Sequence, residues 1–156
     1  MSSSSIPIQD QYMDKRATCF GCGRLNKNGL QIKSFWDGEV LVARYTPAEH
    51  HIGHPGYMNG GIIATLVDCH SVGLAMAEAH DADGREIGSA PLITYVTATL
   101  KVSYLKPTPV TKGPVELRAH MVNKAGRKTW VECSLLVDGV ICVTGEVMAV
   151  RITDPV

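Results

Sequence analysis

One carboxylate in an otherwise apolar stretch is the clearest chemical signal in this sequence. Asp68 lies within residues 61–79, which are rich in Ala, Leu, Ile and Val, and Gly60 and Gly61 stand at the start of that stretch. A carboxylate in apolar surroundings is a candidate nucleophile or general base. If the stretch is a helix, the free backbone N–H groups at its start are able to polarise a carbonyl. Together these features predict attack on an acyl carbonyl.

Asp68 also has an ordinary interpretation, as a solvated residue on an exposed helix stripe. Its neighbours Leu66 and Val67 leave little room for such a stripe. A catalytic triad of Asp68, His70 and Ser71 is excluded, because successive helix positions point about 100° apart and cannot converge. We expect His70 to be a hydrogen-bonded residue of a pocket or an interface.

The cysteines and histidines raise the question of a metal site. Cys19 and Cys22 form a C-x-x-C pair, and His50, His51 and His54 offer further ligands. No second Cys pair and no His-x-x-x-His spacing accompanies them, so the sequence predicts no metal. His54 is expected to line the site beside the helix start. The other three cysteines lie in apolar segments and are expected to act as small hydrophobes: Cys69, Cys133 and Cys142.

Length and charge exclude several classes of protein. The chain has 156 residues, which suits one domain, and its 15 Lys and Arg balance 15 Asp and Glu. This balance lacks the basic footprint of a nucleic-acid binder. We also expect no membrane partner, because no apolar run looks long and charge-free enough to span a bilayer. The Ser-rich start does not resemble a signal peptide, and the unpaired cysteines indicate a reduced, cytoplasmic setting.

The predicted elements position the carboxylate on a central helix. Residues 59–79 contain no Pro and are apolar on nearly every side, which predicts a buried helix. Residues 30–34 and 39–45 alternate around Asp37-Gly38 and predict a hairpin, and four later strands are expected at 92–105, 115–123, 128–137 and 140–152. We therefore predict an α+β domain over residues 19–156, with a curved antiparallel sheet wrapped around the helix. Residues 1–18 are expected to form an N-terminal extension with one short helix.

Four stretches, in this order, resemble the hotdog-fold acyl-CoA thioesterases, and specifically their phenylacetate-degradation-type branch. The first combines residues 19–23 (CFGCG) with residues 28–30 (NGL), and the second is residues 59–68 (NGGIIATLVD). The third is residues 96–109 (VTATLKVSYLKPTP), and residues 126–133 (GRKTWVEC) fit the next hairpin. The resemblance implies a hotdog fold that covers nearly the whole chain.

The resemblance also implies roles for particular residues. Asp68 would attack the thioester or activate a water, and the Gly60 N–H would polarise the thioester carbonyl. Thr97 would lie across a dimer interface from the nucleophile. Asn59 stands where many relatives have His, and Asn cannot become a cation near neutral pH. The remaining substrate contacts are expected to come from the helix start and from cations that meet the coenzyme A phosphates: His54, Gly61, Lys106, Arg127 and Lys128.

The leading functional hypothesis is hydrolysis of an acyl-CoA thioester at a dimer-interface site. It requires no cofactor, because coenzyme A is part of the substrate, and the chain is expected to form a homodimer or homotetramer, since long strands leave an unpaired edge. A non-catalytic acyl-CoA-binding hotdog protein is the alternative. A hotdog dehydratase is disfavoured, because Asn59 supplies no catalytic His at the helix start. The acyl group is left open.

Overall fold

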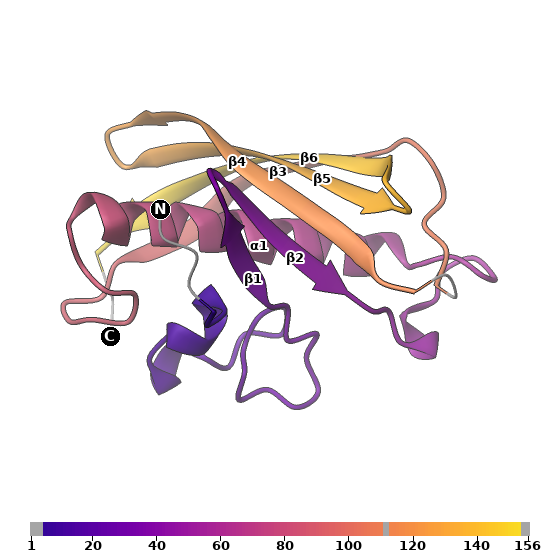
Figure 1. The fold of residues 1–156 in the computed structure, drawn as a ribbon, viewed down its shortest axis with the longest axis horizontal. Helices are drawn as coiled ribbons and strands as arrows, with labels where there is room; N and C mark the ends of the chain where they lie inside the picture. Colours follow the sequence, from indigo (N-terminus) through magenta and orange to yellow (C-terminus); the bar gives the residue numbers. More distant parts are fainter. Residues whose placement is uncertain (1–4, 111–112, 154–156) are drawn as a thin grey trace.

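A computed structural model describes residues 5–110 and 113–153, and it shows one long helix lying along a six-stranded sheet (Figure 1). The helix is α1 (Gly60–Ala82). The strands are β1 (Ser34–Asp37), β2 (Val40–Tyr45), β3 (Thr94–Tyr104), β4 (Val115–Ala125), β5 (Lys128–Val137) and β6 (Val140–Ile152). Three short 3₁₀ helices complete the fold: η1 (Ile8–Gln11), η2 (Asp14–Arg16) and η3 (Glu49–His51). The predicted α+β architecture is confirmed.

The sheet is antiparallel throughout, with the strand order β1-β2-β4-β5-β6-β3. Strands β4, β5 and β6 form the predicted meander. Strand β3 follows α1 directly in the sequence, yet it lies at the far edge of the sheet, beside β6. The chain therefore crosses beneath the sheet as α1 between β2 and β3. This crossover places the helix along the inner face of the sheet and leaves β3 as an edge strand.

The helix lies very close to the sheet at one point. A Cβ atom placed on Gly145 of β6 would lie 2.3 Å from Cγ1 of Val67, so this approach requires glycine. Val67 and the neighbouring Leu66 are fully buried, and so is Leu74, about two turns further along the helix. The predicted helix is confirmed, although it continues three residues beyond residue 79, to Ala82.

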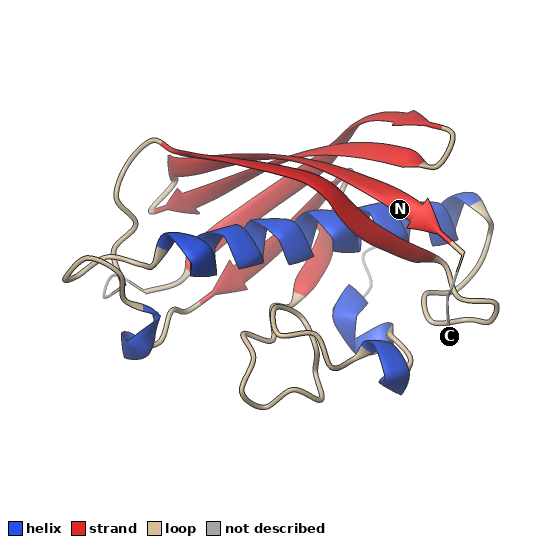
Figure 2. Ribbon diagram, turned by 180° about the vertical axis from the view of Figure 1, so that it is seen from behind, coloured by secondary structure: helices blue, strands red, loops and turns tan. Residues whose placement is uncertain are grey.

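The N-terminal segment covers the side of α1 that faces away from the sheet (Figures 1 and 2). It forms two short 3₁₀ helices rather than the single short helix expected from the sequence. Ile8 belongs to the main hydrophobic core, and Ala17 is fully buried. A Cβ atom on Gly73 of α1 would lie 2.9 Å from Cδ1 of Ile8. The described part of the extension is thus packed into the same core as the sheet.

A buried hydrogen-bond network joins this segment to the rest of the fold. The Gln9 side chain donates from Nε2 to Ser34 Oγ at 2.8 Å and accepts from the Ser34 N–H at 2.8 Å. Nδ1 of His70 lies 2.8 Å from the same Ser34 Oγ, and Nε2 of His70 lies 2.9 Å from the Leu41 carbonyl. The network links η1, β1, β2 and α1. His70 is therefore a core residue and does not face a pocket.

The structure corrects two expectations from the sequence. The first strand begins at Ser34 rather than at residue 30, and the turn at Gly38 has the positive φ of 65° that a tight hairpin requires. Helix α1 is also long and apolar enough to cross a membrane by length and composition, which contradicts our expectation that no such run exists. Its packing between the sheet and the N-terminal segment gives that apolar surface a place in the core.

Burial lowers the pKa of His70 to about 4, and the acceptor carbonyl of Leu41 only partly opposes this shift. His70 therefore takes up a proton near pH 6.5 in the unfolded chain, but only near pH 4 in the native protein. We expect the free energy of unfolding to fall by about 3 kcal/mol between these pH values through this residue alone. Chemical denaturation across this window should show a shallower decline for His70→Asn than for wild type. The exposed His120→Asn is the control, and equal slopes in all three proteins would contradict the assignment.

Candidate active site

Asp68 and Thr97 meet at the boundary between α1 and the edge strand β3. The Thr97 hydroxyl donates to Oδ1 of Asp68 at 2.5 Å. Thr97 points toward the helix because Tyr95, two residues earlier on the same face of β3, packs against Ala75 and Ala79 of α1. A β-bulge interrupts the pairing of β3 with β6 directly after Thr97. Bulges redirect side chains, so this bulge ends the run of β3 residues whose side chains point toward the helix.

This contact corrects the expectation drawn from the resemblance, which placed Thr97 across a dimer interface from Asp68. The two residues belong to the same chain, and their hydrogen bond forms without a second subunit. The physical reason is the strand order, because it places β3 beside the helix of its own chain.

Asp68 has the electrostatic character of a reactive carboxyl group. It is half-buried, and this burial raises its pKa above the ordinary value for Asp. The hydrogen bond from Thr97 opposes that rise, and the nearby Cys19 adds to it. Within the described residues, no hydrogen bond reaches the second carboxylate oxygen, Oδ2. One oxygen is therefore held by Thr97 while the other stays available for a water or a carbonyl carbon.

The start of α1 provides hydrogen-bond donors at a second position. Asn59 is the N-cap, and its Oδ1 accepts from the N–H of Gly61 at 2.8 Å and of Ile62 at 3.3 Å. Gly61 therefore offers no spare N–H. Gly60 is the first helical residue, and its N–H has no acceptor within the helix. The Tyr104 hydroxyl donates to the Gly60 carbonyl at 2.6 Å, which places an edge-strand side chain beside this N–H.

These two positions are too far apart to act together within one chain. Gly60 and Asp68 are eight residues apart on one helix, and a rise of 1.5 Å per residue separates them by about 12 Å. A carbonyl group that is held at Gly60 and attacked at Asp68 requires both groups within about 3 Å of it. Within a single chain, Gly60 and Asp68 therefore cannot both contact one carbonyl group.

An elongated apolar cavity of about 290 Å³ opens beside Asp68. One wall is a face of α1 on which residues repeat every four positions, over about 18 Å of helix: Asp68, Val72, Met76 and His80. The opposite wall comes from the N-terminal segment and β3, and includes Tyr12, Met13, Tyr95 and Thr97. His80 is buried and its Nδ1 donates to the Met76 carbonyl, while its Nε2 has no partner in the described chain. His80 thus leaves one buried ring nitrogen unpaired among the residues that line the cavity.

Similar solved structures share this fold. A thioesterase superfamily protein from Shewanella loihica PV-4 is 33% identical, with a TM-score of 0.65, and the match covers 90% of this chain and 99% of that chain. The chain belongs to the thioesterase superfamily. A phenylacetic acid degradation-related protein from Ralstonia eutropha JMP134 is 18% identical, covers 79% of this chain and 86% of its own, and has a TM-score of 0.63, which shows the shared fold. No family model and no curated protein matches the chain.

The hotdog fold predicted for this thioesterase superfamily member is thereby confirmed. In this fold the central helix carries the candidate carboxylate. The site residues that sequence reasoning missed belong to segments distant from that helix. Tyr104 and Tyr95 were included only as strand residues, and Tyr12 and Met13 lie in the stretch treated as an extension. The contribution of Tyr12 and Met13 depends on how the N-terminal segment packs, and no local sequence motif predicts that packing.

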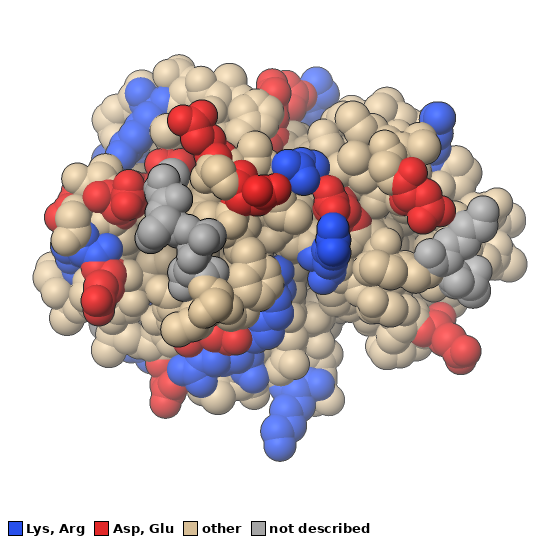
Figure 3. Space-filling view, viewed as in Figure 1, with Lys and Arg blue, Asp and Glu red and all other residues tan. Residues whose placement is uncertain are grey.

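The predicted cations do not form one cluster. Lys106 follows the end of β3, whereas Arg127 lies in the β4–β5 turn near the start of β3, where Thr94 pairs with Ile152. Eleven strand residues separate these ends by about 36 Å. Charges of both signs are also interspersed on the visible face (Figure 3). Arg127 lines a second hollow, of about 640 Å³, with Lys15 and Arg151. His54, Lys106 and Lys128 line neither cavity.

Removal of the Thr97 hydroxyl should shift the titration of Asp68 upward. The hydrogen bond from Thr97 favours the ionised carboxylate, so Thr97→Val is expected to raise the pKa of Asp68 further. Any activity that requires the carboxylate then declines at a higher pH in the variant than in wild type. The measurement is the acidic limb of a kcat/KM profile, or direct NMR titration of the carboxyl carbon. Thr97→Ser keeps the donor and should leave the titration near that of wild type, whereas an unshifted Thr97→Val would contradict the proposed coupling.

Proposed function

We propose that this protein hydrolyses acyl-CoA thioesters with Asp68 as the reactive carboxylate. The observation that carries the proposal is the half-buried Asp68, held at one oxygen by Thr97 and open at the other, at the mouth of an apolar cavity. Superfamily membership supports the same reaction class. The cavity offers an apolar place for the acyl chain, and its wall formed by Val72 and Met76 has few polar groups.

In the proposed reaction the thioester carbonyl lies between a helix start and Asp68. The Gly60 N–H polarises the carbonyl oxygen, and the positive end of the helix dipole favours the developing negative charge. Asp68 either attacks the carbonyl carbon directly or removes a proton from an attacking water. The carbon–sulfur bond breaks in both routes, and coenzyme A leaves as a thiolate that takes up a proton. Direct attack leaves an anhydride between Asp68 and the acyl group, which water then hydrolyses to the free acid, whereas attack by water gives the free acid at once.

We propose that two subunits build each site. The separation of about 12 Å along one helix prevents Gly60 and Asp68 of the same chain from contacting one carbonyl. Strand β3 is an eleven-residue edge whose central residues are exposed, and an unpaired edge of this length favours pairing with a second copy. A twofold axis across this edge makes the two strands, and the two helices, antiparallel. That arrangement directs the helix start of one subunit toward the middle of its partner's helix.

The same pairing would assemble the binding site for the coenzyme A phosphates. Antiparallel β3 strands bring Lys106 of the partner subunit to the end of the sheet that carries Arg127. Arg127 already lines a hollow with Lys15 and Arg151, and this hollow shares Met13 and Leu92 with the cavity beside Asp68. Arginine binds phosphate oxygens in a bidentate manner. We therefore assign Arg127, with Lys106 of the partner subunit, to the nucleotide end of the substrate.

A second candidate function is binding of acyl-CoA without catalysis. Asn59, which stands where many relatives have His, uses its side-chain oxygen to cap α1, so this oxygen is not free to act on substrate. The cavity would still accept an acyl chain. Activity measurements on Asp68 variants distinguish the two functions, since binding alone requires no reactive carboxylate.

Asp68→Asn is expected to reduce turnover of acyl-CoA thioesters by a factor of roughly one hundred or more, because an amide cannot act as nucleophile or base. Asn still accepts the hydrogen bond from Thr97. Since the fold raises the pKa of Asp68, the carboxylate is disfavoured in the native state, and a neutral amide should not lower the melting temperature at pH 7. Hydrolysis of a panel of aromatic, short and long thioesters checks the prediction. Asp81→Asn, at an exposed carboxylate near the end of α1, is the control. Near-normal turnover in Asp68→Asn would refute the proposed function.

Mixed dimers test the two-subunit site. Gly60→Pro removes the N–H at a helix position that tolerates proline, and Asn59 already has the extended backbone (φ −61°, ψ 132°) that a residue before proline requires. Gly60→Ala keeps the N–H and is the control, although its Cβ lies 3.3 Å from the Tyr104 hydroxyl.

Gly60→Pro and Asp68→Asn homodimers should both be nearly inactive. A heterodimer of the two variants should recover about half of the wild-type activity, because one of its two sites receives both intact groups. If each site belonged to a single chain, the heterodimer would stay as inactive as its parents.

A further inference from the structure

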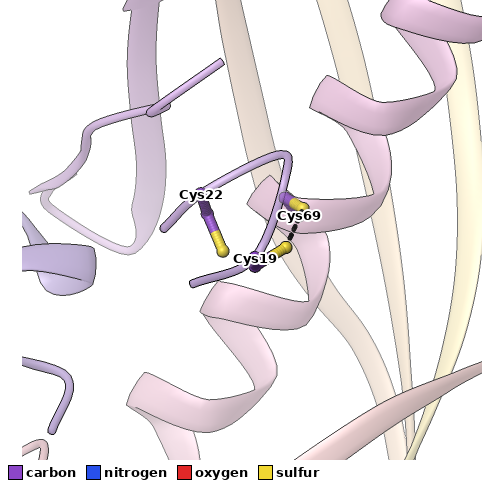
Figure 4. Close-up of side chains that lie close together, drawn as sticks. All are labelled: Cys19, Cys22 and Cys69. Carbon is purple, nitrogen blue, oxygen red and sulfur yellow. Dashed lines mark hydrogen bonds between the residues drawn. The ribbon is translucent and has the colours of Figure 1, made fainter. Parts of the chain in front are cut away.

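We propose that Cys19, Cys22 and Cys69 bind one zinc ion, beside the candidate active site and independently of the thioesterase proposal. Cys19 and Cys22 belong to the loop of the N-terminal segment, and Cys69 comes from α1, 47 residues after Cys22 in the sequence. Figure 4 shows the three side chains directed toward one another from these two segments. Their sulfur atoms all lie within 4.8 Å of one another, and no other group of three or more candidate ligands meets this condition within residues 5–110 and 113–153.

The spacing of the sulfur atoms fits tetrahedral zinc. Two sulfurs bound to one zinc at about 2.3 Å, with a tetrahedral angle between them, are about 3.8 Å apart. Sγ of Cys19 and Sγ of Cys69 are 3.7 Å apart. The C-x-x-C spacing of the other pair is the usual spacing of two zinc ligands from one turn. The Cys22 sulfur lies within 4.8 Å of both others, so a closer approach of at most about 1 Å would bring it to the zinc spacing.

The loop is shaped for this approach by its glycines. A Cβ atom on Gly21 would lie 2.3 Å from Sγ of Cys69, so only glycine lets the loop reach the helix at this point. A Cβ atom on Gly23 would lie 2.5 Å from the Cys19 backbone nitrogen. Glycine is therefore required at both Gly21 and Gly23 for the loop to hold its sulfur atoms beside Cys69.

Cysteine binds zinc as the thiolate. Binding of zinc by the three thiols would therefore release protons to the solvent, and the affinity for zinc would rise with pH.

The proposed ion would fix the N-terminal segment to α1. Cys19, Cys22 and Cys69 line the cavity that contains Asp68, so the ion would stabilise one wall of this cavity. Three sulfurs leave a fourth ligand position for water. The sequence offered only histidines as partners for the two loop cysteines, and on that basis it predicted no metal. His51 uses its Nδ1 for the Ala48 N–H and the Tyr45 hydroxyl, and Cys69 was interpreted as a small hydrophobe.

Metal titration of the full-length protein tests the site. Protein that has been reduced and stripped of metal is titrated with Co²⁺ and then with Zn²⁺. We expect one cobalt per chain, a near-ultraviolet sulfur-to-cobalt charge-transfer band, loss of this band on addition of one equivalent of zinc, and a higher melting temperature with zinc than without it. Cys19→Ser, at an exposed position, should weaken the band and abolish the zinc-dependent rise in melting temperature. Cys142→Ser, at a buried cysteine outside the cluster, should behave as wild type.

Two results would overturn the zinc proposal. One is the absence of a sulfur–cobalt band and of any zinc-dependent stabilisation in folded wild-type protein. The other is ready formation in air of a disulfide within the trio, seen as a loss of two hydrogens in the intact mass, with no metal retained after full reduction. Because the readouts are spectroscopic and thermal, loss of thioesterase activity in Asp68→Asn would not affect them.

Discussion

The orientation of one turn of α1 about its axis determines most of the structure around the candidate site. Val67 faces the sheet at Gly145, and Asp68 faces the edge strand at Thr97. Cys69 faces the N-terminal loop, and His70 faces β1 and β2. Successive residues point about 100° apart, so four consecutive side chains contact four different parts of the fold. A small rotation of the helix would break all four contacts at once, which explains why the site is held firmly.

Two titratable residues in this turn, Asp68 and His70, show how the degree of burial distinguishes a structural group from a candidate reactive group. His70 is fully buried, and both of its ring nitrogens have hydrogen-bond partners, so it stays neutral and holds segments together. Asp68 is only half-buried and has a partner at one oxygen, so part of its hydrogen-bonding capacity is left over. Burial raises the pKa of Asp68 and lowers the pKa of His70, so it favours the neutral form of each group. Only Asp68 also lines a cavity.

The sequence was sufficient for elements whose signals are local. The helix start at Gly60, the three meander strands and the choice of Asp68 as the candidate residue follow from periodicity, turns and one carboxylate in apolar surroundings. Thr97 was named only through the resemblance, and local signals could not place it, because it reaches Asp68 through the register of β3 on the helix and the bulge beside it. Gly145 was missed, since a glycine within a strand does not reveal which helix residue it admits. The environment of Cys69 depends on a loop nearly fifty residues away.

The separation of Lys106 from Arg127 could have been foreseen, because a strand of eleven residues places its ends about 36 Å apart. The same reasoning from fixed geometry applies to the helix, where about 12 Å separates Gly60 from Asp68. Both pairs would be brought together by one operation, the proposed twofold axis across the exposed edge of β3. The strand that supplies Thr97 to the carboxylate is thus also the strand whose pairing would complete the carbonyl site and the phosphate site. Catalysis and assembly would then depend on the same eleven residues, so a substitution that disturbs the β3 edge should affect both together.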